Sequence, residues 1–146
     1  MAGKQHRVSF HKLDKPKRRK HVLDLVHSNI FSMSEKSLEG AYYFVTFIDD
    51  HSRRVQIYLL KTKDQVIQAF KEYHVMVERE TRRKLKVNNG GEYHGPFEAY
   101  CKTYGIKLEK MTPKTPQLNG VVERMNRTIK ERVWCMLSYA KLPKSF

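Results

Sequence analysis

Short apolar stretches separated by polar residues follow one another between positions 21 and 60 of the chain. Three stretches, 21–30, 42–48 and 55–60, are rich in apolar, β-branched and aromatic residues and predict β-strands. Gly40 and the polar cluster 49–52 lie between these stretches and predict turns. This part of the chain is therefore expected to form three successive strands.

A helical period replaces the strand pattern after position 61. Thr62 and Gln65 form a capping-box pattern, which is typical of a helix start. The apolar residues that follow recur on one helical face, at Val66, Phe70, Tyr73 and Val77. Core packing accounts for this face, so no function is assigned to it.

The later elements are short except for the last one. A strand is predicted at 85–87, a helix at 96–104 and a strand at 106–111. The last helix is expected to start at Asn119-Gly120. Its apolar stripe is predicted to be core and consists of Val122, Met125, Ile129, Val133 and Met136. The order of three strands followed by alternating helices and strands indicates an α/β protein with a mixed sheet covered by helices.

The amino-acid composition indicates a class of binding partner. The 29 Lys and Arg residues outnumber the 15 Asp and Glu residues, which gives a net charge of +14 on 146 residues. Such an excess favours binding to a polyanion, and nucleic acid is the simplest candidate. No apolar run approaches the roughly 20 residues that span a bilayer, so no membrane partner is expected. The basic N-terminus lacks an adjoining apolar run, so the chain is expected to be nuclear or cytoplasmic and not secreted.

Residues 1–20 form a basic arm with eight Lys or Arg residues and one acid, Asp14. The densest part is 15–20, Lys-Pro-Lys-Arg-Arg-Lys. It is typical of a nuclear-import signal or of an arm that grips phosphates, and a solvated linker remains the plain alternative. On the second interpretation the arm residues that contact DNA are Lys17, Arg18, Arg19 and Lys20.

Four sequence motifs occur in a fixed order along the chain. They are HSN at 27–29, YYFVTFIDDHSR at 42–53, NNGGEY at 88–93 and TPKTPQLNGVVERMNR at 112–127. Together they resemble the integrase catalytic core of copia-type LTR retrotransposons, in the retroviral-integrase, RNase H-like superfamily. The resemblance implies an RNase H-like α/β fold with a mixed five-stranded sheet flanked by helices. It assigns 21–146 to the core, with the C-terminal helices truncated.

The same resemblance bears on zinc binding. Family members carry a zinc-binding module that ends just before a run similar to 3–10, so the chain is expected to start immediately after it. Cys101 and Cys135 lack CxxC spacing and are predicted to be buried free thiols. No zinc is expected.

The family's catalytic triad is altered in this sequence. The resemblance places the two catalytic aspartates at Asn29 and Asn88, and only the glutamate, Glu123, is retained. Paired Mg²⁺ or Mn²⁺ ions prefer anionic oxygen ligands, and an Asn side chain offers one neutral oxygen. The centre is therefore expected to be inactive, with Glu123 a metal ligand only if it is active.

Rescue by other carboxylates is an alternative. Asp24, Asp49, Asp50 and Glu92 are the nearby candidates, but Asp24 is expected on the opposite strand face and the Asp49-Asp50 pair looks like an ordinary strand end. The run before Asn88 also looks shortened by about three residues, and an odd shift reverses the face that a strand residue uses. Even restored aspartates are then expected to be misdirected.

The last helix carries the candidate DNA contacts. Glu123, Arg127 and Lys130 share a stripe distinct from the apolar one. By spacing alone this stripe is a surface ion pair of small energetic value. The resemblance instead implies that basic side chains here contact DNA, and it adds Arg124 and Asn126 to the set.

Three hypotheses follow. The chain is a degenerate integrase core fragment, or a nucleic-acid-binding protein derived from such a core without catalysis, or an active enzyme with a rearranged metal site. DNA is the expected partner in all three, and a homo-oligomer is a further candidate. Missing C-terminal helices would leave an exposed apolar patch, near which Trp134 is expected.

Overall fold

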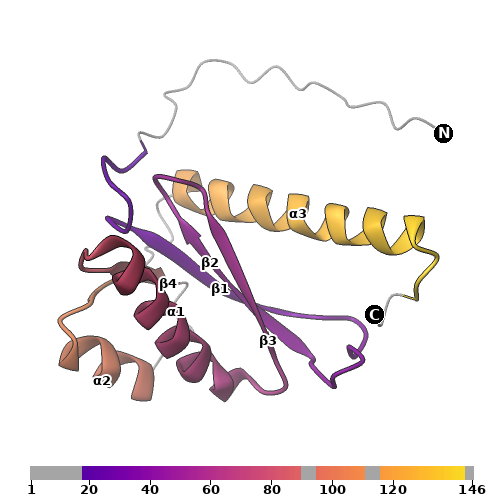
Figure 1. The fold of residues 1–146 in the computed structure, drawn as a ribbon, viewed down its shortest axis with the longest axis horizontal. Helices are drawn as coiled ribbons and strands as arrows, with labels where there is room; N and C mark the ends of the chain where they lie inside the picture. The colour runs from indigo at the N-terminus through magenta and orange to yellow at the C-terminus, as the bar shows by residue number, and fades with distance from the viewer. Residues whose placement is uncertain (1–17, 90–94, 111–115, 144–146) are drawn as a thin grey trace.

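The computed structural model describes residues 18–89, 95–110 and 116–143. Its elements follow the predicted order, with one short 3₁₀ helix added before the first long helix (Figure 1). They are β1 (Val26–Ser32), β2 (Tyr43–Asp49), β3 (Val55–Leu60), η1 (Lys63–Gln65), α1 (Val66–Thr81), β4 (Lys86–Asn89), α2 (Pro96–Thr103), β5 (Lys107–Lys110) and α3 (Pro116–Tyr139).

The five strands form one mixed sheet in the order β3-β2-β1-β4-β5. β1 pairs antiparallel with β2 and parallel with β4, and the β4–β5 pair is also parallel. The antiparallel half comes from consecutive strands joined by turns, whereas the parallel half needs α1 and α2 as crossovers. The fold class predicted from the sequence, a mixed five-stranded sheet flanked by helices, is confirmed.

One face of the sheet carries the hydrophobic core. Phe47 of β2 lies at its centre, with its ring 4.6 Å from that of Tyr73 and 5.7 Å from that of Phe70 on α1. The Phe70 ring is in turn 4.6 Å from that of Phe97 on α2. Alternation along the strands sends Val26, Val45 and Phe47 to this face, so α1 and α2 both pack on it.

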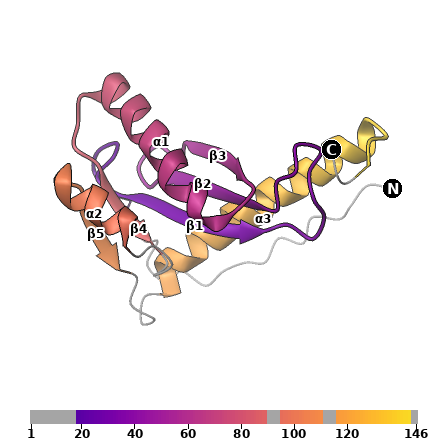
Figure 2. The ribbon, with the colours of Figure 1, turned by 90° about the horizontal axis from the view of Figure 1, so that it is seen from below.

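α3 lies on the opposite face, as Figure 2 shows. Phe31 belongs to that face, and the Nζ atom of Lys130 lies 5.5 Å from its ring centre. The prediction that the whole apolar stripe of α3 is core is wrong at its C-terminal end. Val133 and Met136 are 43% and 63% exposed, because the strands do not cover that part of the helix closely.

Several predicted boundaries shift. β1 starts at Val26 and not at 21, because Leu23 has a positive φ of 65° that breaks the extended backbone. α3 starts at Pro116, before the expected Asn119-Gly120. The Thr62 side chain makes no capping hydrogen bond, although the Gln65 side chain accepts one from the Lys61 N–H at 2.7 Å.

The backbone conformation at the end of α1 can be tested by substitution. Arg82 caps α1 with a left-handed backbone, φ 53°, and its N–H donates to the Glu78 carbonyl. Glycine adopts this conformation without strain, so we expect Arg82→Gly to raise the free energy of unfolding by about 0.5 kcal/mol. Urea unfolding measures the change. Arg83→Gly, at the next exposed position, is the control and is expected to lower it.

Candidate functional site

Positions 29 and 88 occupy the same face of the sheet. Position 88 is in register with His27 across the parallel β1–β4 pair, and Asn29 is two residues further along β1. Residues two apart on a strand share a face, and so do register partners. This register does not support the expectation that the shortened run before Asn88 turns it away from Asn29. Asn88 lies in β4, whereas the sequence placed it in the turn after the strand.

Glu123 lies on α3, which covers this face. α3 and β1 run in the same general direction, from left to right in both views (Figures 1 and 2). The Lys130–Phe31 contact fixes how the two elements are aligned. Glu123 precedes Lys130 by about 10 Å along the helix, and Asn29 precedes Phe31 by about 7 Å along the strand. Measured along the direction of β1, the exposed Glu123 therefore lies at about the same height as Asn29 and as the pair formed by His27 and position 88.

Buried polar atoms lie along this face. Asn126 is 4% exposed, and neither of its side-chain polar atoms has a hydrogen-bond partner within the described residues. The same holds for Thr46 Oγ1 and His27 Nδ1, and Thr46 is the register partner of Asn29. Asn126 was predicted to contact DNA, but such contact requires exposure that this side chain does not have here.

The residues present do not fit a pair of divalent ions. Of the three positions that the resemblance assigns to the triad, Asn29 and Asn88 are neutral amides and only Glu123 is a carboxylate. Within 18–89, 95–110 and 116–143, no cluster of three or more His, Cys, Asp or Glu side chains could hold a metal. Amide and hydroxyl groups suit hydrogen bonds to water or phosphate oxygens, whereas Mg²⁺ and Mn²⁺ prefer carboxylates.

The other acids suggested for rescue are engaged elsewhere. Asp24 accepts the His21 N–H at 3.1 Å and lies before β1, so the strand-face argument does not apply to it. Asp49 accepts the Leu23 N–H at 2.8 Å and the Ser52 hydroxyl at 2.6 Å, which makes it a turn cap. Glu92 lies outside the described residues.

Asp50 forms a buried ion pair beside the site. One carboxylate oxygen accepts from His27 Nε2 at 3.0 Å and from Arg53 at 3.3 Å, and the other accepts the Arg19 N–H at 2.9 Å. Burial by itself would raise the pKa of Asp50. The hydrogen bonds from His27 and Arg19 and the positive charges of His27 and Arg53 outweigh burial, so its pKa is lowered.

Asp50 also fixes the end of the basic arm. Arg19 donates its backbone N–H to Asp50, and its guanidinium lies 3.5 Å from the carboxylate of Glu109 on β5. Glu109 is in register with position 88, so Arg19 reaches the row of the sheet that contains position 88. Arg18 and Lys20 are exposed beside it, and Lys17 lies outside the described residues.

The basic residues of α3 are exposed along the helix. Arg124, Arg127 and Lys130 are all open to solvent, and Arg124 Nε donates to the Gly120 carbonyl at 2.9 Å. The described part of the chain contains no ion pair between Glu123 and Arg127, so the surface-pair interpretation of this stripe gains no support.

Sequence reasoning missed His27, Thr46 and Glu109 as residues of this face. His27 could have been found, because it precedes Asn29 by two positions and so shares its strand face. Thr46 is a polar residue within the apolar run 42–48. Glu109 gave no signal, since its relation to position 88 depends on the register of two short parallel strands.

Comparisons with known proteins agree with this geometry. No protein-family model matches the chain. The chain resembles a simian T-cell lymphotropic virus intasome in complex with a PP2A regulatory subunit, with a TM-score of 0.66 and 20% identity over 93% of this chain and 50% of that one. The chain therefore shares its fold with a chain of that intasome.

Sequence relatives narrow this class. The chain is 57% identical, over 99% of its length, to the retrovirus-related Pol polyprotein from transposon TNT 1-94 of Nicotiana tabacum. It is 32% identical, over 85% of its length, to the corresponding polyprotein from transposon RE1 of Arabidopsis thaliana. The chain is therefore similar to one segment of the retrovirus-related Pol polyproteins of transposons. Its assignment to the copia type stays a prediction.

The chain spans about a tenth of the length of these relatives, 11% and 9%. Both asparagines and Glu123 fall within the matched segment. No helix in the described part of the chain has the length and apolar content to cross a membrane.

Proposed function

We propose that this chain is an integrase core that holds DNA without cutting or joining it. The observation that carries the proposal is a contrast within one site, between the basic side chains on α3 and the asparagines on the strands. Arg127 and Lys130 are exposed next to Glu123, while the two other triad positions are Asn29 and Asn88. Phosphate binding needs only cations at the surface, whereas two-metal phosphoryl transfer needs several carboxylates.

The partners follow from the same chemistry. DNA is bound through the α3 cations and through the arm, whose Arg19 is held beside the site by Asp50 and Glu109. The structural neighbour is an intasome, and a homo-oligomer of this chain is a second partner. Mg²⁺ or Mn²⁺ serves the family and is not bound productively here. The basic run at 15–20 supports a nuclear location, with the cytoplasm as the alternative.

Binding to duplex DNA is expected to weaken steeply as salt rises, because cations on the protein displace counterions from the phosphates. Replacing Arg124, Arg127 and Lys130 by Glu is expected to lower affinity about 100-fold at low salt and to reduce the salt slope by about 3. Fluorescence anisotropy over a salt series measures both. Lys71→Glu, Arg79→Glu and Lys102→Glu change the net charge equally on α1 and α2. If this control loses as much affinity, binding does not depend on the α3 cations.

A metal-dependent enzyme is the second candidate, because Glu109 is a carboxylate in register with position 88. It is paired with Arg19, which argues against its use as a metal ligand. Mn²⁺-dependent nicking of duplex DNA by the unmodified chain would contradict the non-catalytic proposal. Loss of that nicking in Glu109→Gln would then identify the substitute ligand.

A further inference from the structure

The parallel half of the sheet has a basic edge where its strands begin. β1, β4 and β5 run in the same direction, so the loops that enter β4 and β5 lie at one edge of the sheet. The exposed cations of this region, which form the basic edge, are Arg82, Arg83, Lys84, Lys86, Lys102 and Lys107. Among the ion pairs of the described residues, none involves Arg82, Arg83 or Lys84, and the neighbouring acid Glu80 is paired with Arg54. This edge therefore presents positive charge to a partner.

An exposed aromatic ring lies at the same edge. Tyr104 follows α2, three residues before Lys107, and is 56% exposed. Its ring is 4.5 Å from that of Tyr100 and 5.6 Å from that of His74 on α1. The Tyr100 hydroxyl is in turn hydrogen-bonded to His74 Nδ1 at 2.9 Å. Packing therefore holds the Tyr104 ring in place while more than half of the residue stays exposed, as a surface for base stacking requires.

The ring and the cations are close enough for one strand of nucleic acid to contact both. Lys86 and Lys107 are register partners in adjacent strands, which are about 5 Å apart. Arg83 precedes Lys86 by three residues, as Tyr104 precedes Lys107, and three residues span about 10 Å at most. Sites for single strands cover roughly 4 to 16 nucleotides, with cations along the phosphates and aromatic rings stacked on bases. A short single strand can therefore reach from Tyr104 to Arg83.

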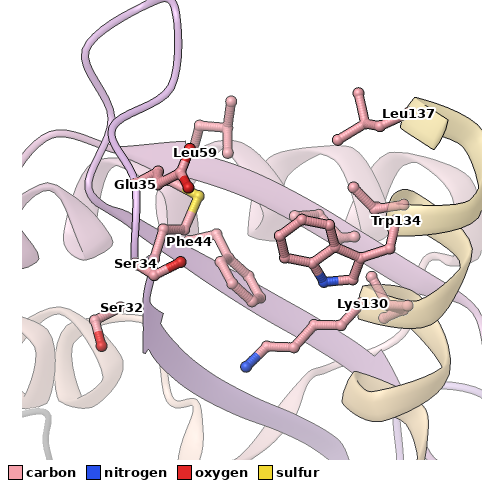
Figure 3. A pocket seen from close by; sticks show the side chains of 12 residues that line it. Ser32, Ser34, Glu35, Phe44, Leu59, Lys130, Trp134 and Leu137 are labelled. Atoms are coloured by element: carbon pink, nitrogen blue, oxygen red, sulfur yellow. The ribbon is translucent and has the colours of Figure 1, made fainter. Parts of the chain in front are cut away.

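A second aromatic surface of the chain lacks such a row of cations. The predicted exposed apolar patch is present as a cavity of about 460 Å³ between α3 and the sheet, where Phe44 and Trp134 face one another (Figure 3). Lys130 is the only cation among the described residues that line it. Successive phosphates would find no partners there, so a single strand fits the basic edge better.

We infer that the basic edge binds single-stranded DNA, with one base stacked on Tyr104 and neighbouring phosphates on Arg82, Arg83 and Lys84. Duplex DNA does not suit Tyr104, because the bases of a duplex are already stacked on one another. The choice of DNA over RNA rests on the proposed function, in which α3 holds duplex DNA. The surface itself is separate, because α1 and α2 pack on the face of the sheet opposite α3 (Figure 2).

An oligo(dT) of about 12 nucleotides tests the stacking contact by fluorescence anisotropy. We expect Tyr104→Ala to weaken binding about 10-fold, because a stacked base is lost, and Tyr104→Phe to stay within about 2-fold of the unmodified chain. Tyr139→Ala removes a tyrosine that is 94% exposed on α3 and should change nothing. With 5-iododeoxyuridine in the oligonucleotide, ultraviolet cross-linking to the unmodified chain should mark Tyr104 in peptide mass spectrometry.

The salt dependence of oligo(dT) binding tests the cations. Arg82→Gln, Arg83→Gln and Lys84→Gln together should reduce the slope of log affinity against log salt by about 2, since each phosphate contact of a single strand contributes about 0.7. The matched control replaces Lys36, Lys61 and Lys63 by Gln, at exposed positions near the other end of α1. Its slope should equal that of the unmodified chain.

Duplex DNA distinguishes this inference from the proposed function. Tyr104→Ala should leave duplex binding unchanged, and oligo(dT) binding should still depend on Tyr104 when Arg124, Arg127 and Lys130 are replaced by Glu. A chain that binds oligo(dT) through Tyr104 but binds no duplex would contradict the proposed function alone. The inference is wrong if oligo(dT) does not bind, if Tyr104→Ala binds it as tightly as the unmodified chain, or if an oligo(rU) of the same length binds more tightly.

Discussion

Restoring aspartate at positions 29 and 88 together is expected to lower the stability of the metal-free chain and to make that stability depend on Mg²⁺ or Mn²⁺. The two positions share one face of the sheet and are one row apart, with Glu123 above them on α3. Three carboxylates so arranged repel one another, and Asn29 is already half-buried. With asparagine at both positions this repulsion is absent.

The size of the effect follows from the number of carboxylates. Each carboxylate that is held close to another lowers the free energy of unfolding by roughly 1 to 2 kcal/mol. The double variant should therefore have a free energy of unfolding about 3 kcal/mol lower in the absence of metal. A metal ion that binds only the folded state restores RT ln(1 + [L]/Kd), or about 2.7 kcal/mol at a hundredfold excess over Kd. The unmodified chain should show neither the loss nor the metal response.

Thermal unfolding with EDTA, Mg²⁺ and Mn²⁺ measures these changes, with strand transfer on duplex DNA as a second readout. Gln68→Glu with Thr62→Asp adds the same charge at exposed positions and should behave like the unmodified chain. A restored variant that neither loses stability nor responds to metal would show that the site no longer brings the three positions together. A metal response without strand transfer would confine the defect to steps after metal binding.

How far the sequence predicted this site depends on the type of signal. Hydrophobic periodicity predicted the order of elements, because each apolar face must be buried by another element. The motifs placed Asn29, Asn88 and Glu123, and the register later brought positions 29 and 88 to one face. Neither periodicity nor the motifs could supply the register itself, because it depends on how α1 returns the chain to the edge of β1.

The failures have physical causes that single residues reveal. Val133 and Met136 fit a core stripe, yet a stripe is buried only where another element covers it. Asn126 was included only because it belongs to the motif, and its side chain is buried here. Cys135, predicted to be buried, is exposed, while Cys101 is buried as expected. Burial raises the pKa of the Cys101 thiol to about 12.

The second large effect is expected for Asp50→Asn. Asp50 is 4% exposed and His27 1%, so the hydrogen bond between them is shielded from water. Asparagine at position 50 would leave the Arg53 charge without its buried carboxylate partner, which costs about 3 kcal/mol. The Arg19 N–H would also lose its charged acceptor, so the arm should be released from the core. Urea unfolding measures the first effect, and faster tryptic cleavage at 18–20 measures the second.

The pH dependence of the free energy of unfolding distinguishes the contribution of the Asp50 charge from that of side-chain packing. The pKa of Asp50 is lowered in the folded state relative to its ordinary value of 3.8. Its contribution is therefore complete above that value and is lost as the pH falls through the lowered pKa. The difference between the unmodified chain and Asp50→Asn should be constant near neutral pH and shrink in acid below the ordinary pKa. Asp64→Asn, at an exposed position, should show little difference at either pH.

A double-mutant cycle with His27→Ala shows whether the effect belongs to the pair. If His27 and Asp50 act together, the second substitution should cost much less once the first is present. Additive losses would instead mean that Asp50 acts through Arg19 and Arg53. That outcome would also change the view of the DNA site. The arm would then be held by Asp50 independently of the strand that carries Asn29, and Asp50→Asn should weaken DNA binding while His27→Ala should not.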